Sequence, residues 1–220
     1  TMDERIFYMN MCIKERLSKR ELERQIDSGY YERYMLSQNP QSPALETAKK
    51  ATGNIFLDNY VLDFLDVPDP MSEHDLQKSI IRNLKDFILE IGKDFTFVGE
   101  EYRVQVGNHD FFIDLLFYHR GLSCLVAFEL KIGEFKPEYV GQINLYLEAL
   151  DREIKKENEN PSVGIILCAS KDDEVVEFAL SRSLSPTMVA EYNLKLIDKK
   201  LLQKKLKEYI ELAENEFDNE

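Results

Sequence analysis

The chain has 220 residues, of which 44% are apolar and 31% are charged, and its formal net charge is −13. This length and apolar content allow one good-sized domain with an appendage, and they exclude a wholly disordered chain. No run of 18 apolar residues is present, so the sequence predicts no membrane-spanning helix. The acidic balance disfavours broad contact with nucleic acid, so a DNA-binding function needs a local basic patch or a partner that supplies one.

Cysteine usage and the first residues indicate the compartment. The three cysteines, Cys12, Cys124 and Cys168, form no CxxC pair, which disfavours a disulfide framework and a Cys-based zinc site. The amino-terminal stretch is charged and lacks the apolar core of a signal peptide. We therefore expect a cytoplasmic protein. Thr1 precedes Met2, which suggests a fragment of a longer chain.

The amino-terminal quarter of the sequence is predicted to be helical and then to form a linker. Apolar residues recur at a mostly helical spacing over 3–36, among many charged residues. Residues 37–54 are rich in Ser, Pro, Asn and Thr, a composition typical of a linker or loop. We therefore divide the chain into a helical segment with a linker over 1–54 and a second domain over 55–220.

The second domain is predicted to open with helices. Apolar residues from Tyr60 to Leu65 suggest a short helix, which the VPDP stretch ends. Ser72 followed by Asp75 three residues later is typical of a helix N-terminus. An apolar stripe extends that predicted helix to Ile91.

Strands and turns follow this helix. The turns at 107–110 and at Gly121 are short, which indicates antiparallel pairing of the first three strands. A helix predicted over 137–156 precedes the fourth strand, which indicates a parallel crossover. We expect an α/β fold with a mixed sheet in the order αβββαβ and helices on both faces. The strands are predicted at 95–106, 111–120, 123–132, 162–169 and 187–195, and further helices at 173–183 and 198–215.

Three charged residues interrupt two of these strands, which are otherwise apolar. Asp114 lies in the middle of the second strand, and Glu129 and Lys131 lie near the end of the third. Strands that are apolar on both faces are typical of a covered sheet, where an unpaired charge is costly. Residues two apart on a strand share a face, so Glu129 and Lys131 project together, and Asp114 approaches them from the neighbouring strand.

These residues fit a divalent-metal site. Asp114, Glu129 and the backbone carbonyl of Leu130 supply the sparse oxygen ligands that Mg²⁺ or Mn²⁺ accepts while it keeps several waters. The cation would polarise a phosphate and lower the pKa of a bound water. Lys131 would orient that water or neutralise developing negative charge. The alternative is a purely structural salt bridge between Lys131 and one carboxylate.

Other polar residues are candidates for substrate contact. Gln142 and Tyr146 are four residues apart on a predicted helix and share a face, so they could contact a phosphate and the substrate backbone. His119 and Arg120 end the second predicted strand and could contact DNA at the mouth of the site, and Lys136 lies near the site and could bind a phosphate. For each of these residues the alternative is a side chain that simply faces solvent.

The stretches that carry these residues resemble a known family. The chain is similar to the YhcG-like proteins, a bacterial group of PD-(D/E)xK nucleases formerly classed as a domain of unknown function. Asp114 matches the motif aspartate, and Glu129 with Lys131 matches the ExK element. Gln142 and Tyr146 resemble the QxxxY element of RecB-like nucleases. The matching stretches include FILEIGKDFTFVGEEYRVQVG, FFIDLLFYHR, LVAFELKIGEFKPEYVGQINLYL and VAEYNLKL.

The resemblance covers roughly residues 60–205 and implies a restriction-endonuclease-like fold, cleavage of phosphodiester bonds in DNA, and a role near recombination, repair or restriction–modification. The segment ELERQIDSGYYER resembles the end of the family's helical N-terminal domain. The family pattern has a glutamate where this chain has Gln77. Glu73, one turn earlier on the first helix, is the candidate substitute as a metal ligand.

Two functions follow from this sequence. The first is a Mg²⁺- or Mn²⁺-dependent DNA endonuclease with Asp114, Glu129 and Lys131 at its centre. The second is a catalytically inactive nuclease-fold module that binds DNA or protein partners, which the acidic balance and Gln77 favour. The expected partners are DNA, a second copy of the chain, and restriction or recombination proteins.

Overall fold

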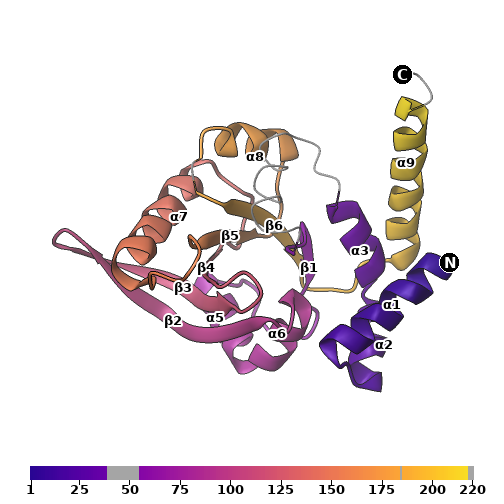
Figure 1. Cartoon of the computed structure of the whole chain (residues 1–220), viewed down its shortest axis with the longest axis horizontal. Coiled ribbons are helices and arrows are strands. Elements are labelled where there is room, and N and C mark those ends of the chain that lie inside the picture. Colours follow the sequence, from indigo (N-terminus) through magenta and orange to yellow (C-terminus); the bar gives the residue numbers. More distant parts are fainter. Residues whose placement is uncertain (39–54, 184, 218–220) are drawn as a thin grey trace.

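The computed structural model describes residues 1–38, 55–183 and 185–217. Within these residues, six strands form one sheet in the order β1-β6-β5-β4-β3-β2 (Figure 1). The strands are β1 (Asn59–Val61), β2 (Phe95–Val106), β3 (His109–His119), β4 (Cys124–Leu130), β5 (Val163–Cys168) and β6 (Thr187–Asn193).

The sheet combines an antiparallel part and a parallel part. β2, β3 and β4 pair antiparallel, and β4, β5, β6 and β1 pair parallel. A two-residue turn joins β2 to β3, with Gly107 at a φ of 60°, a conformation that glycine adopts without strain. The predicted mixed sheet is confirmed.

Helices cover both faces of the sheet. Leu76 of α5 and Phe87 of α6 belong to the apolar layer on one face. Ile143 and Leu147 of α7, with Val176 of α8, belong to the layer on the other face. None of the described helices has the length and apolar character that crossing a lipid bilayer would take. The helices are α1 (Met2–Glu15), α2 (Lys19–Asp27), α3 (Tyr30–Ser37), α5 (Glu73–Arg82), α6 (Leu84–Ile91), α7 (Glu138–Ala149), the π-helical turn η1 (Leu150–Ile154), α8 (Asp173–Leu180) and α9 (Lys199–Phe217).

The predicted start of the first core helix is confirmed, but the helix is divided. The Ser72 side chain accepts a hydrogen bond from the Asp75 backbone, and the Asp75 side chain accepts one from the Ser72 backbone. At Asn83 the backbone leaves the helical region, with φ −111° and ψ 29°, so α5 ends and α6 begins. The predicted single helix over 72–91 is therefore two helices.

The predicted short helix at Tyr60–Leu65 is wrong, because β1 occupies the beginning of this segment. β1 pairs parallel with β6 at the edge of the sheet. Tyr60, Val61 and Leu62 are consecutive and all buried, which is typical of a strand that is covered on both faces. Over so few residues, this pattern cannot be told from part of a buried helix.

The amino-terminal segment forms three helices where continuous helical periodicity was predicted. Arg16 adopts a left-handed conformation with φ 50° and ends α1, and Ser18 caps α2. Gly29, with φ 65°, turns the chain into α3. The predicted linker over 37–54 lies almost wholly outside the described residues. In Figure 1, α9 stands beside α1 and α3, away from the sheet.

Candidate active site

The three predicted charged residues come together at the end of β4. Glu129 and Lys131 flank Leu130, whose side chain lies in the apolar layer of α5 and α6. The alternation of the strand therefore turns Glu129 and Lys131 toward α7. The Lys131 Nζ atom lies 5.1 Å from the ring centre of Tyr139 on that helix. Glu129 is 1% exposed and Lys131 is 8% exposed.

Asp114 joins them where the pairing of β3 with β4 stops. The last paired residues of the two strands are Leu115 and Phe128. Beyond this pair, the Leu130 backbone N–H donates a hydrogen bond of 2.7 Å to the Asp114 Oδ2 atom. The carboxylate thus replaces a backbone acceptor at the end of the ladder, and this fixes its position beside β4.

Lys131 bridges two carboxylates from different elements. Its Nζ atom lies 2.8 Å from Glu129 Oε1 and 3.3 Å from Glu73 Oε2. Glu73 is the first residue of α5 and its side chain is about half exposed. The sequence did not pair Glu73 with Lys131, because the contact joins residues far apart in the chain.

Burial and crowding shift the pKa values of these groups. Burial, together with the negative charge of Asp114, raises the pKa of Glu129 to about 7. Burial likewise raises the pKa of Asp114, although the hydrogen bond from Leu130 opposes the shift. Burial alone would lower the pKa of Lys131, but Glu129 and Glu73 outweigh it and raise that pKa.

The residues present fit a cation that prefers oxygen ligands. Glu129 Oε2 is buried and has no hydrogen-bond partner among the described residues, which is unusual for a buried polar atom. A carboxylate oxygen in that state suits a hard cation such as Mg²⁺. Within the described part of the chain, no three His, Cys, Asp or Glu side chains are grouped closely enough to hold a metal ion. The protein ligands here would therefore be few, which Mg²⁺ tolerates because it keeps several waters.

Gln77 contacts Asp114 from the other side of the sheet. Its Nε2 atom donates a hydrogen bond of 2.8 Å to the Asp114 backbone carbonyl, and the residue is only 5% exposed. Because Asp114 Oδ2 also accepts from Leu130, both the backbone and the carboxylate of Asp114 are held.

Gln142 and Tyr146 face the carboxylates from α7. Gln142 Nε2 donates a 2.8 Å hydrogen bond to the Tyr146 hydroxyl. Tyr146 is 3% exposed, and burial raises its pKa, with further contributions from the charges of Glu129 and Asp114. Sequence reasoning missed Tyr139, although its spacing of three residues before Gln142 places it on the same helical face.

Comparison with known proteins settles the family. The sequence model described as the YhcG PDDEXK nuclease domain matches residues 53–207. The chain belongs to this family. The Escherichia coli (strain K12) protein named "Putative nuclease YhcG" is 36% identical over 208 residues, which cover 93% of this chain and 56% of that protein. The chain thus spans little more than half the length of this curated relative.

Solved structures give weaker likenesses. A repair endonuclease from Pyrococcus abyssi has a TM-score of 0.38 at 17% identity, over 57% of this chain and 48% of the other. The EndoMS–dsDNA2 complex has a TM-score of 0.37 at 19% identity, over 55% of this chain and 43% of the other.

The structure does not bring all the expected DNA contacts of this YhcG nuclease domain together. His119 pairs with Cys124 at the opposite end of β4 from Lys131 and is 2% exposed. Its ring packs against Phe95 at 4.7 Å, and its Nδ1 atom accepts a hydrogen bond from the Leu122 backbone. This burial does not agree with a place at the mouth of the site.

The two expected cationic contacts are both exposed, but they lie in different places. Arg120 follows His119, so it shares the distant end of β3. Lys136 lies in the loop between β4 and α7, which leaves the sheet directly after Lys131. Lys136 is therefore the expected cation that lies closest in the chain to the YhcG-family motif.

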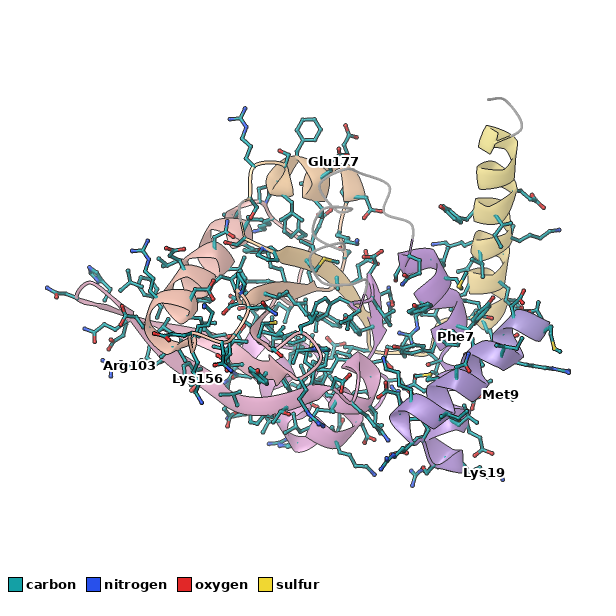
Figure 2. All side chains as sticks on the ribbon, in the orientation of Figure 1. Phe7, Met9, Lys19, Arg103, Lys156 and Glu177 are labelled. Carbon is teal, nitrogen blue, oxygen red and sulfur yellow. The ribbon has the colours of Figure 1, made fainter. Side chains whose placement is uncertain are left out.

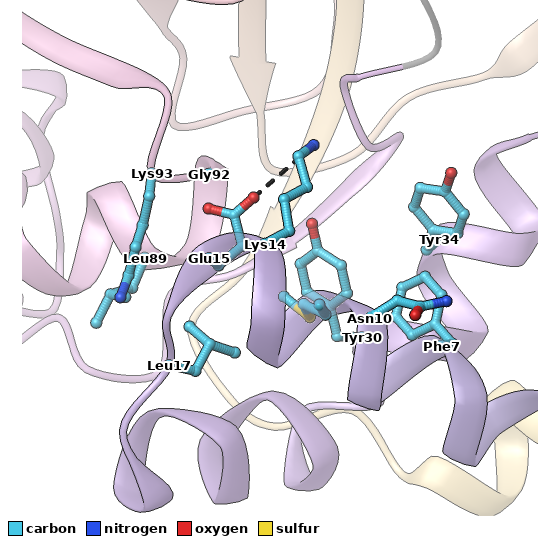
Figure 3. Close-up of a pocket in the computed structure, with 11 residues that line it drawn as sticks. Phe7, Asn10, Lys14, Glu15, Leu17, Tyr30, Tyr34, Leu89, Gly92 and Lys93 are labelled. Carbon is cyan, nitrogen blue, oxygen red and sulfur yellow. Dashed lines mark ion pairs between the residues drawn. The ribbon is translucent and has the colours of Figure 1, made fainter.

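A separate cavity lies between the amino-terminal helices and α6 (Figure 3). Its volume is about 340 Å³, and Phe7, Tyr30 and Tyr34 form much of its wall. Lys14 and Glu15, which form an ion pair at 3.9 Å, also line the cavity. None of the candidate catalytic residues lines this cavity.

Proposed function

We propose that this domain is a metal-dependent nuclease that hydrolyses phosphodiester bonds in DNA. The observation that carries the proposal is the convergence of Asp114, Glu129 and Lys131 at the carboxyl end of β4, where one buried oxygen of Glu129 has no hydrogen-bond partner among the described residues. A structural salt bridge accounts for Lys131 and Glu129 Oε1. It does not account for the unpartnered Oε2 atom or for the nearby Asp114.

The carboxylates of Asp114 and Glu129, with the backbone carbonyl of Leu130, would hold Mg²⁺ or Mn²⁺. Glu73 is the carboxylate that α5 can add, because its half-exposed side chain lies beside the same lysine. The bound cation supplies polarisation of the phosphate and a lower pKa for a coordinated water. Asp114 Oδ1 is available for this role, because among the described residues only Oδ2 has a hydrogen-bond partner.

Lys131 holds a positive charge beside the site and donates to the attacking water or to the phosphate oxygens. Its ion pairs with Glu129 and Glu73 restrict the motion of the Lys131 side chain and hold the ammonium group at the site. Gln142 and Tyr146 form a hydrogen-bonded pair on α7 that positions the scissile strand. Lys136, on the loop after β4, contacts a DNA phosphate.

The net charge of −13 shapes the choice of partners. A strongly acidic surface repels the DNA backbone, so binding needs local cations such as Lys136 or a partner that supplies more of them. We therefore place the domain in a larger assembly, as a homodimer or with restriction or recombination proteins. Recombination, repair or restriction in the cytoplasm is the setting we propose.

One observation favours a second candidate, an inactive nuclease-fold module that binds DNA or protein. The helix that faces the site contributes the neutral Gln77 to Asp114, and the acidic Glu73 contacts a lysine. If the site binds metal too weakly for catalysis, the domain would keep only a role in binding DNA or protein. Cleavage and metal binding distinguish the two candidates.

A nicking assay on supercoiled, linear and branched DNA with Mg²⁺ or Mn²⁺ tests the proposal. We expect cleavage by the wild type and at least about a hundredfold loss in Asp114→Ala, since the ligand set is sparse. Asp110→Ala is the matched control, because Asp110 lies on the same strand in an exposed pair with Arg103 at 2.8 Å. Full activity of Asp114→Ala would overturn the assignment of the site.

A further inference from the structure

Asp114 lies at a weak point of the sheet. Its strand continues past the end of the pairing with β4, into the β2–β3 hairpin that projects from the body and carries Arg103 (Figures 1 and 2). On β2, Glu101 lies between the partners of Leu115 and Ile113 and has a φ of 44°, which is uncommon for a residue other than glycine. β2 pairs with Ile113 and Leu115 on either side, so among the described residues the ladder holds Asp114 only through its two neighbours.

Gln77 supplies the missing restraint. Its amide N–H₂ donates to the Asp114 carbonyl at 2.8 Å, from a position on α5 that is itself fixed by the buried neighbours Leu76 and Ile80. The bond requires a donor. A carboxylate in this place would set one acceptor against another, and it would add negative charge beside Asp114 and Glu129.

We infer that Gln77 is a positioning residue, which aims the Asp114 carboxylate by fixing the Asp114 backbone from α5. Asp114 Oδ2 then accepts the Leu130 backbone N–H, and Oδ1 would be the oxygen left to hold a cation. The inference rests on the proposed function for its catalytic meaning. The strength of the hydrogen bond from the Leu130 amide to Asp114 can be measured without any metal, and it reports the position of the Asp114 carboxylate.

Two matched substitutions test this role. Gln77→Met keeps the length of the side chain and removes the donor. Ser79→Ala is the control, because Ser79 is buried on the same helix and its hydroxyl donates to the Asp66 carbonyl at 2.9 Å, away from the site. Both variants lose one part-buried side chain-to-backbone hydrogen bond from α5.

Residue-resolved amide hydrogen exchange, without divalent metal, is the first measurement. We expect the Leu130 amide to exchange about tenfold faster in Gln77→Met, which corresponds to the loss of an ordinary hydrogen bond. The Lys131 amide, which donates to the Leu167 carbonyl at 2.9 Å, should be unchanged. Ser79→Ala should leave the ratio of the two exchange rates as in the wild type.

Mn²⁺ affinity is the second measurement, by calorimetry on the same three proteins. We expect Gln77→Met to bind roughly 10- to 100-fold more weakly, as for other residues that orient a metal ligand, and Ser79→Ala to match the wild type. Unchanged Leu130 exchange in Gln77→Met, or equal acceleration at Leu130 and Lys131, overturns the positioning role. Failure of the wild type to bind Mn²⁺ overturns the proposed function, while the exchange rates still decide the role of Gln77.

Discussion

Glu129 is buried beside Asp114, with one oxygen bonded to Lys131 and the other without a hydrogen-bond partner in the part of the chain that the structure describes. Without a cation, the ionised form of this carboxyl is costly, and its pKa is raised to about 7. With a cation, the same burial strengthens the electrostatic attraction between metal and ligand. One residue thus links proton binding, metal binding and stability.

The stability of the metal-free domain should therefore depend on pH through Glu129. Between pH 4.5, the ordinary pKa of the group, and about 7, the unfolded chain releases this proton while the folded chain keeps it. The folded state binds more protons, so the free energy of unfolding falls as the pH rises through this window. Asp114 has a raised pKa as well and contributes with the same sign.

Urea unfolding at pH 5 and pH 8, without divalent metal, measures this effect. We expect the wild type to lose more stability between the two pH values than Glu129→Gln, which has no proton to release. Equal losses in the two proteins would mean that Glu129 has an ordinary pKa in the folded state.

At the scale of single residues, the sequence identified the charged residues that interrupt otherwise apolar strands. Asp114, Glu129 and Lys131 were found because charges inside apolar strands are costly. The contacts of Gln77 and Glu73 were not predicted, since they depend on where α5 crosses the sheet. No local spacing encodes that crossing.

At the scale of elements, the placement of α7 depends on its close approach to β5. A Cβ atom at Gly164 would lie 2.6 Å from the Ile143 Cγ1 atom and 3.2 Å from the Leu147 Cδ1 atom. The absence of a side chain at Gly164 allows the helix to come near the strand, and α7 carries Gln142 and Tyr146. The position of this pair over the site therefore depends on Gly164.

Gly164→Ala should lower the free energy of unfolding by about 1–3 kcal/mol, the usual cost of overpacking a core. Gly141→Ala is the matched control on α7, because Gly141 is exposed and an added Cβ would meet nothing within 4 Å. That control should gain about 0.5–1 kcal/mol, since alanine favours a helix over glycine. Chemical denaturation of both variants checks the pair, and a Gly164→Ala variant as stable as the wild type would contradict the packing.

The elements themselves were predictable where a pattern ran for many residues. The strands β2 to β5 follow their predicted ranges closely, because each combines apolar residues with clear turns. β1 was missed, because a strand of three residues is too short to show a period. The break at Asn83 was missed, because the apolar stripe continues through it.

At the scale of the molecule, a buried charge network ties the amino-terminal helices to the sheet domain. Glu90 of α6 pairs with Arg33 of α3 at 2.6 Å and with Arg24 of α2 at 3.0 Å. The same carboxylate accepts the Val61 backbone N–H of β1 at 2.7 Å. This network crosses the boundary predicted between 1–54 and 55–220, so we expect the two parts to unfold together.

Arg33→Met leaves Glu90 buried with one partner fewer and should lower the free energy of unfolding by about 3–5 kcal/mol. Arg103→Met breaks an ion pair that is exposed on the β2–β3 hairpin and should leave stability nearly unchanged. Thermal or urea unfolding compares the two. A stable Arg33→Met variant, or a separate early transition in the wild type, would contradict the coupling of the two parts.

The most direct test of the central claim is calorimetric titration of Mn²⁺ into the wild type, Asp114→Ala and Asp110→Ala at pH 8, where Glu129 is largely ionised. A metal-dependent nuclease site predicts binding by the wild type and by Asp110→Ala, and a loss of at least about a hundredfold in affinity in Asp114→Ala. Equal binding by all three proteins, or no binding by the wild type, would contradict the claim that Asp114 and Glu129 form a metal centre.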